Sequence, residues 1–334
     1  MNLMEYKIER LQELKEILNP KNPALEDIIR LAEIKNKWFS KEHIEASLAA
    51  IRNHFLDPTK LEAWLASYQL KACEKKLGLI LAGNIPLVGF HDLLCAFLVN
   101  AEVQVKLSSK DEVLMGFIIK QLKELDITWK ASIVDRLAAF DAVIATGSDN
   151  SNRYFEQYFS KVPHILRKNR SSIAVLNGTE TAQDLHLLAK DIFMYFGLGC
   201  RNVSKLFLPK GYDIASLFPY LDNYKHFAEH NLYKDNYDYN RTLLLMNLEE
   251  HLANDFLMVK EDPSLHSRLA TIHYSFYKNE TEVQDYIIKH HEELQVVVSK
   301  PSEHWKSEPF GKSQEPELAD YADHIDTLQF LLSL

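Results

Sequence analysis

The sequence predicts an α/β fold with mostly parallel sheets, preceded by a helical segment. Residues 3–72 show only the apolar spacing of helices, interrupted by prolines at 20, 23 and 58. From residue 77 onward, short apolar runs alternate with amphipathic segments, which is the pattern of βαβ units. A length of 334 residues suits two domains, or one large domain with an appendage.

The elements follow one another in a regular order. Apolar runs predict strands, and helical spacing predicts the segments between them. In the first part we expect strands at 77–82, 103–107, 142–145 and 172–176, and helices at 92–98, 113–125, 151–159 and 182–195. After the apolar run 205–208 we expect helices at 213–232 and 241–255, strands at 271–277 and 293–299, a loop at 301–314, and at 318–332 either a helix or a helix plus a strand.

Composition excludes several classes of protein. The net charge of −9 argues against general binding to nucleic acids or membrane surfaces. Cys73, Cys95 and Cys200 form no CxxC spacing, which is typical of reduced thiols in the cytoplasm, and no signal peptide or apolar stretch of about 20 residues is visible. We expect no metal site, because the pair His226 and His230 lacks a third ligand.

Cys200 lies in an unusual setting for a cysteine. Gly197 and Gly199 precede it closely, although the whole chain has only 10 glycines. Glycines leave a neighbouring thiol uncovered and permit tight turns. Cys200 is therefore either an exposed nucleophile or, as free cysteines usually are, a small buried apolar residue. Cys73 and Cys95 fall in helical patterns, and we expect them in the core.

Three expected strands end in small or polar residues. These ends are Gly83-Asn84-Ile85-Pro86, Lys106-Leu107-Ser108-Ser109-Lys110, and Thr146-Gly147-Ser148. Parallel sheets bind ligands at the carboxyl ends of their strands, and a helix that starts after a glycine turn presents N–H groups to a phosphate. The usual G-x-G-x-x-G fingerprint of dinucleotide binding is absent.

Together with Leu318-Ala319-Asp320-Tyr321-Ala322-Asp323, these segments resemble the aldehyde dehydrogenase superfamily and, more closely, the acyl-CoA reductase (LuxC-type) family. The resemblance implies two three-layer α/β domains with parallel sheets. The nucleotide-binding domain would take residues 1–180, with 305–334 packing back onto it, and the catalytic domain would take residues 181–304.

The resemblance also implies roles for single residues. Cys200 would be the nucleophile, and the Asn84 amide would form an oxyanion hole with the Cys200 backbone N–H. Lys106 would contact the adenosine ribose, with Ser108 and Ser109 beside it. Gly147 and Ser148 would contact the pyrophosphate of the cofactor.

Two departures from the superfamily pattern carry information. Members that release acids have a glutamate that activates water, but here the corresponding segment, 167–171, holds no acidic residue. A thiol such as CoA needs such a base less than water does. Ser109 and Lys110 stand where NAD-preferring relatives often have a glutamate, which favours NADPH, with NADH possible.

The sequence thus predicts a cytoplasmic, NAD(P)H-dependent acyl-CoA reductase that makes a (fatty) aldehyde through an acyl group on Cys200. Its partners would be acyl-CoA, the nicotinamide cofactor, and either a second copy of the chain or an acyl-activating enzyme. Two alternatives remain, a CoA-independent aldehyde dehydrogenase and a non-catalytic subunit of a fatty-acid reductase assembly.

Overall fold

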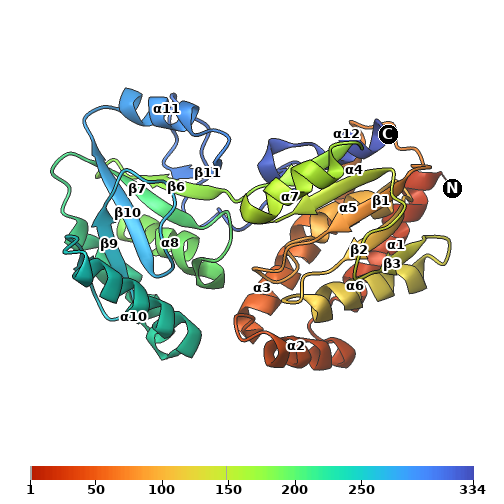
Figure 1. Ribbon diagram of the computed structural model, residues 1–334, viewed down its shortest axis with the longest axis horizontal. Helices are drawn as coiled ribbons and strands as arrows, with labels where there is room; N and C mark the ends of the chain where they lie inside the picture. The colour runs from red at the N-terminus through yellow and green to blue at the C-terminus, as the bar shows by residue number, and fades with distance from the viewer. Residues whose placement is uncertain (1, 148) are drawn as a thin grey trace. The chain divides into compact units, whose positions relative to one another are not determined.

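The computed structural model describes residues 2–147 and 149–334, with backbone only at 149 and 150. The chain forms two compact units, the first made of residues up to 169 together with 316–334 and the second of residues 170–315 (Figure 1). These limits differ from the expected ones at 180 and 305. The difference arises because the strand that begins at Ser171 pairs only with strands of the second unit.

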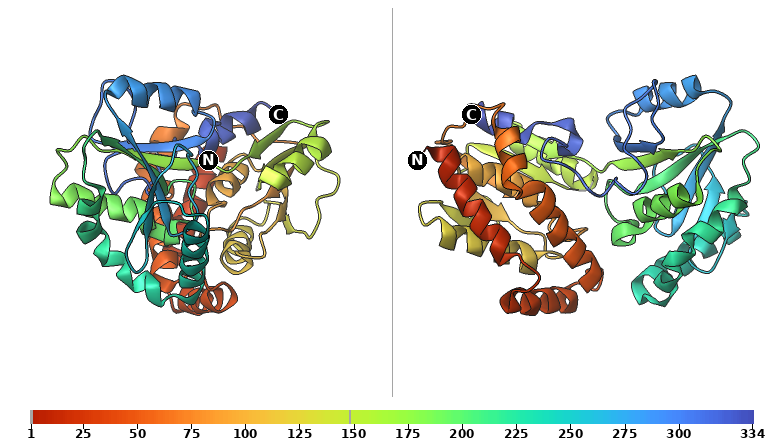
Figure 2. Two further views of the ribbon diagram at one scale, coloured as in Figure 1. Left: turned by 60° about the vertical axis from the view of Figure 1, so that its left-hand side comes forward. Right: turned by 180° about the vertical axis from the view of Figure 1, so that it is seen from behind.

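The helical start of unit 1 follows from its capping residues. Its helices are α1 (Leu3–Ile17), α2 (Pro23–Lys35), α3 (Lys41–Ala50), which continues into a π-helical turn over Ile51–Phe55, and α4 (Pro58–Leu65). Asn2, Asn22, Ser40 and Asp57 accept hydrogen bonds at the helix starts, and prolines occupy the first position of α2 and α4. Viewed from behind, these helices lie across one face of the first sheet (Figure 2).

The first sheet has five parallel strands in the order β3-β2-β1-β4-β5. They are β1 (Lys76–Ile80), β2 (Glu102–Lys106), β3 (Ala131–Ile133), β4 (Ala142–Thr146) and β5 (His164–Arg167). Helices α5 (Phe90–Leu98) and α6 (Glu112–Leu125) share a core with α1–α4, whereas α7 (Asp149–Phe159) packs on a separate core. The strand order reverses beside β1, which is the usual place for a ligand in such sheets.

The C-terminal segment belongs to unit 1. It contains a short turn at Ala322–His324 and α12 (Thr327–Leu332), and no strand. Buried Arg167 joins it to the sheet, because its guanidinium donates to both carboxylate oxygens of Asp92, at 2.6 and 3.1 Å, and to Thr327 Oγ1 at 2.8 Å. On the other side, Trp64 Nε1 donates to Tyr321 Oη at 2.9 Å.

Unit 2 is built on a six-stranded sheet in the order β11-β6-β7-β10-β9-β8. Five strands are parallel: β6 (Ser171–Val175), β7 (Val203–Pro209), β9 (Met258–Glu261), β10 (Thr271–Tyr277) and β11 (Leu294–Ser299); β8 (Leu252–Ala253) is antiparallel. Helix α8 (Ala182–Phe193) lies on one face and α11 (Glu280–Lys289) on the other (Figures 1 and 2). The expected α/β class with helices leading into parallel sheets is confirmed.

Two expected helices of unit 2 differ from the observed ones. In place of one α-helix at 213–232, a 3₁₀ helix (Ile214–Leu217), α9 (Phe218–Leu221) and a second 3₁₀ helix (Asp222–Glu229) follow one another, and Pro219 lies in this stretch. Instead of a helix at 241–255, α10 spans Asn231–Met246. His230 caps its start, and the left-handed Leu248 (φ 55°) turns the chain toward β8.

Candidate active site

Residues 194–202, here called the nucleophile loop, connect α8 to β7. Directly after α8, Tyr195 and Phe196 adopt left-handed backbone angles (φ 56° and 57°), and Gly197 follows at φ 75°. A left-handed conformation costs a residue with a side chain roughly 1–2 kcal/mol. The two aromatic residues therefore hold a strained turn that places Cys200 just before the start of β7.

Aromatic packing opposes this strain. The ring of Phe196, which is 5% exposed, lies 4.4 Å from the ring of Phe227 and 4.5 Å from that of His230, between centroids. Tyr233 adds a third ring at 6.1 Å. Buried aromatic pairs contribute roughly 0.5–1.5 kcal/mol beyond the area they bury, which is comparable to the backbone strain.

Asn202 fixes the far end of the nucleophile loop. Its buried side chain donates to three carbonyl oxygens at the end of α8, those of Asp191, Ile192 and Met194, at 2.9–3.2 Å. Its Oδ1 accepts from the Gly199 N–H at 2.8 Å. A single amide thus serves carbonyls that a helix end leaves without partners and also holds the backbone beside the cysteine.

Cys200 is half-buried within this loop. Its carbonyl oxygen accepts from Ser172 Oγ of β6 at 3.0 Å, and the adjacent Arg201 Nε donates to the Ser313 carbonyl. Ser313 lies in a segment that buried Asp191 anchors to α8, by accepting from the N–H groups of Gly311 and Ser313. The cysteine backbone is therefore held from β6, and Arg201 is held from the 311–313 segment.

The other two cysteines lie elsewhere. Cys95 in α5 is fully buried, as expected, and burial raises its pKa well above the ordinary value. Cys73 was expected in a helix of the core; instead it is half-buried in an irregular segment between α4 and β1, because helix α4 already ends at Leu65.

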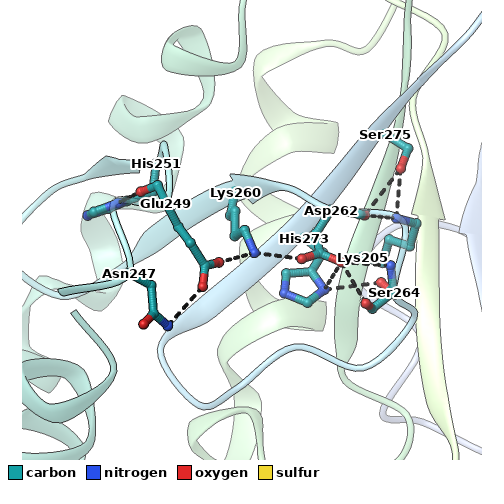
Figure 3. Close-up of polar contacts among 9 residues, drawn as sticks. All are labelled: Lys205, Asn247, Glu249, His251, Lys260, Asp262, Ser264, His273 and Ser275. Carbon is teal, nitrogen blue, oxygen red and sulfur yellow. Dashed lines mark hydrogen bonds and ion pairs between the residues drawn. The ribbon is translucent and has the colours of Figure 1, made fainter. Parts of the chain in front are cut away.

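A polar network fixes β7 beyond the nucleophile loop (Figure 3). Lys205 is fully buried, and its Nζ donates to the Asp262 carbonyl and, at 2.8 Å, to Ser275 Oγ. Burial lowers the pKa of Lys205 to about 8. The Asp262 carboxylate pairs with Lys260 at 2.7 Å, and Lys260 also pairs with Glu249. These contacts tie β7, β9 and β10 together on one face of the sheet.

The predicted cofactor residues, together with Asn84, lie at the carboxyl ends of neighbouring strands of the first sheet. This end of the sheet is here called the cofactor edge. Strands β2 and β4 flank β1, so the segments that follow them are neighbours. These are the Asn84 loop (83–89) after β1, the Lys106 loop (106–111) at the end of β2, and Gly147 after β4. Within unit 1 the structure thus brings Asn84, Lys106, Ser108, Ser109 and Gly147 to a common edge.

The Lys106 loop packs closely against Gly83. A Cβ at Gly83 would lie 2.7 Å from Ser108 Oγ, so only glycine fits there. Ser108 Oγ accepts from the Lys110 N–H at 3.3 Å and therefore shapes the turn. Lys106, Ser109 and Lys110 are exposed and can reach a ligand.

Gly147 permits a close approach between β4 and α7. A Cβ there would lie 2.8 Å from the ring of Phe155. Asn152 Nδ2 donates to the carbonyls of Gly147 and Arg167, at 3.1 and 3.0 Å, and so joins β4 to β5 at this turn. Ser148, the other residue expected at the pyrophosphate, lies outside the described residues.

Cys200 belongs to unit 2 and Asn84 to unit 1, so their pairing in an oxyanion hole stays a prediction. Sequence reasoning missed Asn202, Ser172 and Asp191, which hold the nucleophile loop. Their partners are backbone groups that no sequence pattern reveals. Among the described residues, no group of three or more His, Cys, Asp or Glu side chains is placed to hold a metal ion, and no described helix is long and apolar enough to span a membrane.

Comparison with solved structures defines the class of fold. An aldehyde dehydrogenase-like protein from Burkholderia cenocepacia matches with a TM-score of 0.67 and 14% identity over 91% of this chain and 75% of the other. The Mycobacterium tuberculosis aldehyde dehydrogenase in complex with NAD+ matches with a TM-score of 0.64 and 10% identity, over 91% of this chain and 74% of the other. An aldehyde dehydrogenase C mutant from Pseudomonas syringae, in complex with NAD+ and octanal, matches with a TM-score of 0.62 and 11% identity, over 90% of this chain and 72% of the other. The fold is that of the aldehyde dehydrogenases, as expected.

A family model assigns the chain to one family among the proteins with this fold. A model of the acyl-CoA reductase (LuxC) family matches residues 3–216, which is more than half of the chain and includes both the cofactor edge and the nucleophile loop. The chain belongs to the acyl-CoA reductase (LuxC) family. Curated proteins yield no match.

Proposed function

We propose that the chain reduces a fatty acyl-CoA thioester to the aldehyde, with NADPH as the preferred hydride donor and Cys200 as the acyl carrier. The observation that carries the proposal is the nucleophile loop. It is strained at Tyr195 and Phe196, clamped by Asn202, and holds half-buried Cys200 between Gly199 and the start of β7. Preorganisation of this kind is what nucleophilic catalysis requires.

The first half of the proposed reaction forms an acyl-enzyme. The Cys200 thiolate attacks the thioester carbonyl carbon, and the carbonyl oxygen becomes an oxyanion. The Asn84 amide and the Cys200 N–H would donate hydrogen bonds to that oxygen. When it collapses, the bond to the CoA sulfur breaks, and CoA leaves as a thiolate. Loss of one oxyanion donor typically lowers such rates by about 10²–10³.

The second half releases the aldehyde. Bound NADPH would supply hydride to the acyl carbon. The same two donors would then hold the oxyanion of the thiohemiacetal on Cys200. As this oxyanion collapses, the carbon–sulfur bond breaks, the aldehyde departs and the thiolate returns. The protein needs no general base in either half, which agrees with the lack of an acidic residue at 167–171.

The residues at the cofactor edge fit a nicotinamide dinucleotide. Gly83 and Gly147 let the turns after β1 and β4 pack closely against Ser108 and Phe155, which fixes the backbone at these strand ends. Exposed Lys106, Ser109 and Lys110 offer a hydroxyl and two cations to the ribose and its phosphate. The NAD+ complexes of the two solved relatives support a dinucleotide in general, and NADPH is our proposal from Ser109 and Lys110.

The arginines of segment 167–171, which replaces the segment with the water-activating glutamate, make structural contacts. The Arg167 guanidinium is buried on Asp92 and Thr327, and Arg170 Nη1 donates to the carbonyls of His291 and Leu294. Neither side chain can take a proton from water. This favours thiol chemistry over the CoA-independent dehydrogenase, and octanal in one solved relative agrees with an apolar aldehyde.

Intact-mass and peptide spectrometry after incubation with acyl-CoAs of different chain length tests the proposal. We expect an acyl adduct on Cys200 that NADPH removes as free aldehyde, and no adduct in Cys200→Ser. An adduct on Cys73 or Cys95 would contradict the assignment. Aldehyde oxidation that proceeds equally well without CoA would favour the dehydrogenase. Absence of any adduct unless an acyl-activating enzyme is added would point to a subunit of a larger assembly.

A further inference from the structure

Asp111 is a buried acid in an unusual position. It precedes α6 directly, where an aspartate commonly caps the helix, but its side chain makes no capping hydrogen bond. Only 2% of the residue is exposed. Its Oδ2 instead accepts from the backbone N–H of Leu87, 24 positions earlier in the chain, at 2.8 Å.

The hydrogen bond from Leu87 supports a strained backbone. Leu87 is left-handed, with φ 58°, although it carries a branched side chain and is buried. Such a residue persists only where its surroundings hold it in place. Here the Asn84 loop is held twice, since Leu87 donates to Asp111 and the preceding Pro86 carbonyl accepts from Ser47 Oγ at 2.8 Å.

Asp111 is also the last residue of the Lys106 loop. Its own N–H donates to the Ser108 carbonyl at 3.0 Å. A Cβ at Gly83 would lie 3.1 Å from the Asp111 Cβ, so the two loops are in direct contact at this residue. Asp111 therefore belongs to the loop of predicted cofactor residues and, through its side chain, holds the loop of the predicted oxyanion donor.

We propose that Asp111 is a positioning residue that acts through Leu87 to set Asn84 relative to the Lys106 loop. The inference rests on the proposed function, which assigns Asn84 to the oxyanion. In Asp111→Ala the Leu87 N–H loses its acceptor, and the Asn84 loop can relax out of its strained form. In Asp111→Asn a neutral oxygen can still accept, so the loop is retained.

Stopped-flow acylation and NADPH titration test this on the full chain. We expect Asp111→Ala to slow acylation of Cys200 by at least about tenfold, since a shift of about 1 Å in a positioned group can cost 10²-fold. Its Km for acyl-CoA and its affinity for NADPH should change less than threefold, because Lys106 and Ser109 remain. Asp111→Asn should stay within about threefold of wild type. Equal acylation by Asp111→Ala and wild type would overturn the proposal, as would an equal loss in both variants.

Hydrogen exchange provides a readout that does not depend on activity. The amide of Leu87 should exchange at least about tenfold faster in Asp111→Ala than in wild type or Asp111→Asn, whereas amides of β4 keep their rates. Asp141→Asn is the control, because Asp141 is an exposed acid of the same unit that also accepts from a backbone N–H, that of Lys76, at 2.8 Å; it should leave the exchange rate of the Leu87 amide unchanged.

The two measurements separate the possible failures. If wild type forms no acyl adduct, the proposed function fails, and unchanged Leu87 exchange in Asp111→Ala would then refute the positioning role as well. If Asp111→Ala does not fold, Asp111→Ser, whose shorter side chain cannot reach Leu87, takes its place in both experiments.

Discussion

The Oδ1 atom of Asn202 accepts a hydrogen bond from the backbone N–H of Gly199 at 2.8 Å, and so one amide holds the residue before the candidate nucleophile to the end of α8. Asn202→Asp keeps this acceptor but loses the donors to three carbonyls and adds a buried charge. We expect a loss of stability of roughly 2–4 kcal/mol and slower acylation of Cys200. Chemical denaturation and adduct kinetics measure both, with exposed Asn177→Ala as control. Wild-type behaviour of Asn202→Asp would contradict the clamp.

Cys200 should be the first cysteine to react with a limiting amount of iodoacetamide. Cys95 is fully buried and its pKa is raised, so its labelling should be slower by on the order of tenfold or more. Peptide mass spectrometry over time gives the rates of all three cysteines. Prior incubation with acyl-CoA should protect Cys200 alone, and preferential labelling of Cys95 would refute the assignment.

Ser109 should set the choice of cofactor. We expect NADPH to bind more tightly than NADH by on the order of tenfold, or about 1.4 kcal/mol, and Ser109→Glu to reverse the preference through repulsion of the 2′-phosphate. Dissociation constants from fluorescence titration decide this. Ser160→Glu, the same change at an exposed serine just after α7, should leave the preference as it is. Equal affinities in wild type would show that residues 109 and 110 do not read the ribose.

Asp111 should make stability depend on pH. Burial raises its pKa to about 7, above the ordinary 3.8. Its folded pKa exceeds its unfolded pKa, so its contribution is fully present below about pH 4 and is lost as pH rises through 7. The difference of about 3 units bounds the loss at on the order of 4 kcal/mol. Asp111→Asn should therefore lose less thermal stability than wild type between about pH 5 and pH 8. If the melting temperatures of the two proteins fall equally over this pH range, Asp111 does not make stability depend on pH.

The helical start should be essential to the stability of unit 1. Lys7 and Asp126 are both buried and lie 2.7 Å apart, so α1 is joined to the end of α6 by an ion pair. Lys7→Met leaves a buried charge without its partner, which typically costs 3–5 kcal/mol, about half of a normal domain's stability. Arg30→Ala breaks the exposed pair with Asp27 and should cost less than about 1 kcal/mol. Similar unfolding midpoints for the two variants would show that the buried pair is dispensable.

Most strands could be predicted because buried parallel strands are continuous apolar runs. The predictions for β1, β2, β4 and β6 start or end within two residues of the observed limits. The short strands β3, β5, β8 and β9 were missed, since two to four residues give too little pattern. The helix expected at 241–255 instead ends at Met246, because Leu248 reverses the chain through a conformation that leucine rarely adopts.

The site divides in the same way. Cys200, Asn84 and Gly147 could be predicted because each lies at or beside a glycine, and glycines can be found directly in the sequence. The residues that hold them, Asn202 and Asp111, make their contacts with backbone groups 3 to 24 positions away. Such contacts exist only after the chain has folded, so composition and spacing contain no trace of them.

The division of the chain into units has a consequence for its synthesis. Unit 2 is one continuous stretch, whereas unit 1 needs Leu318, Leu328 and Leu331 to complete its core. The ribosome synthesises these residues only after the whole of unit 2, so the N-terminal helices and the first sheet emerge long before their final partners. Unit 2 can reach its native state while still tethered. Unit 1 instead passes through a period with α5 and Arg167 uncovered, when a chaperone or protease would find it most accessible.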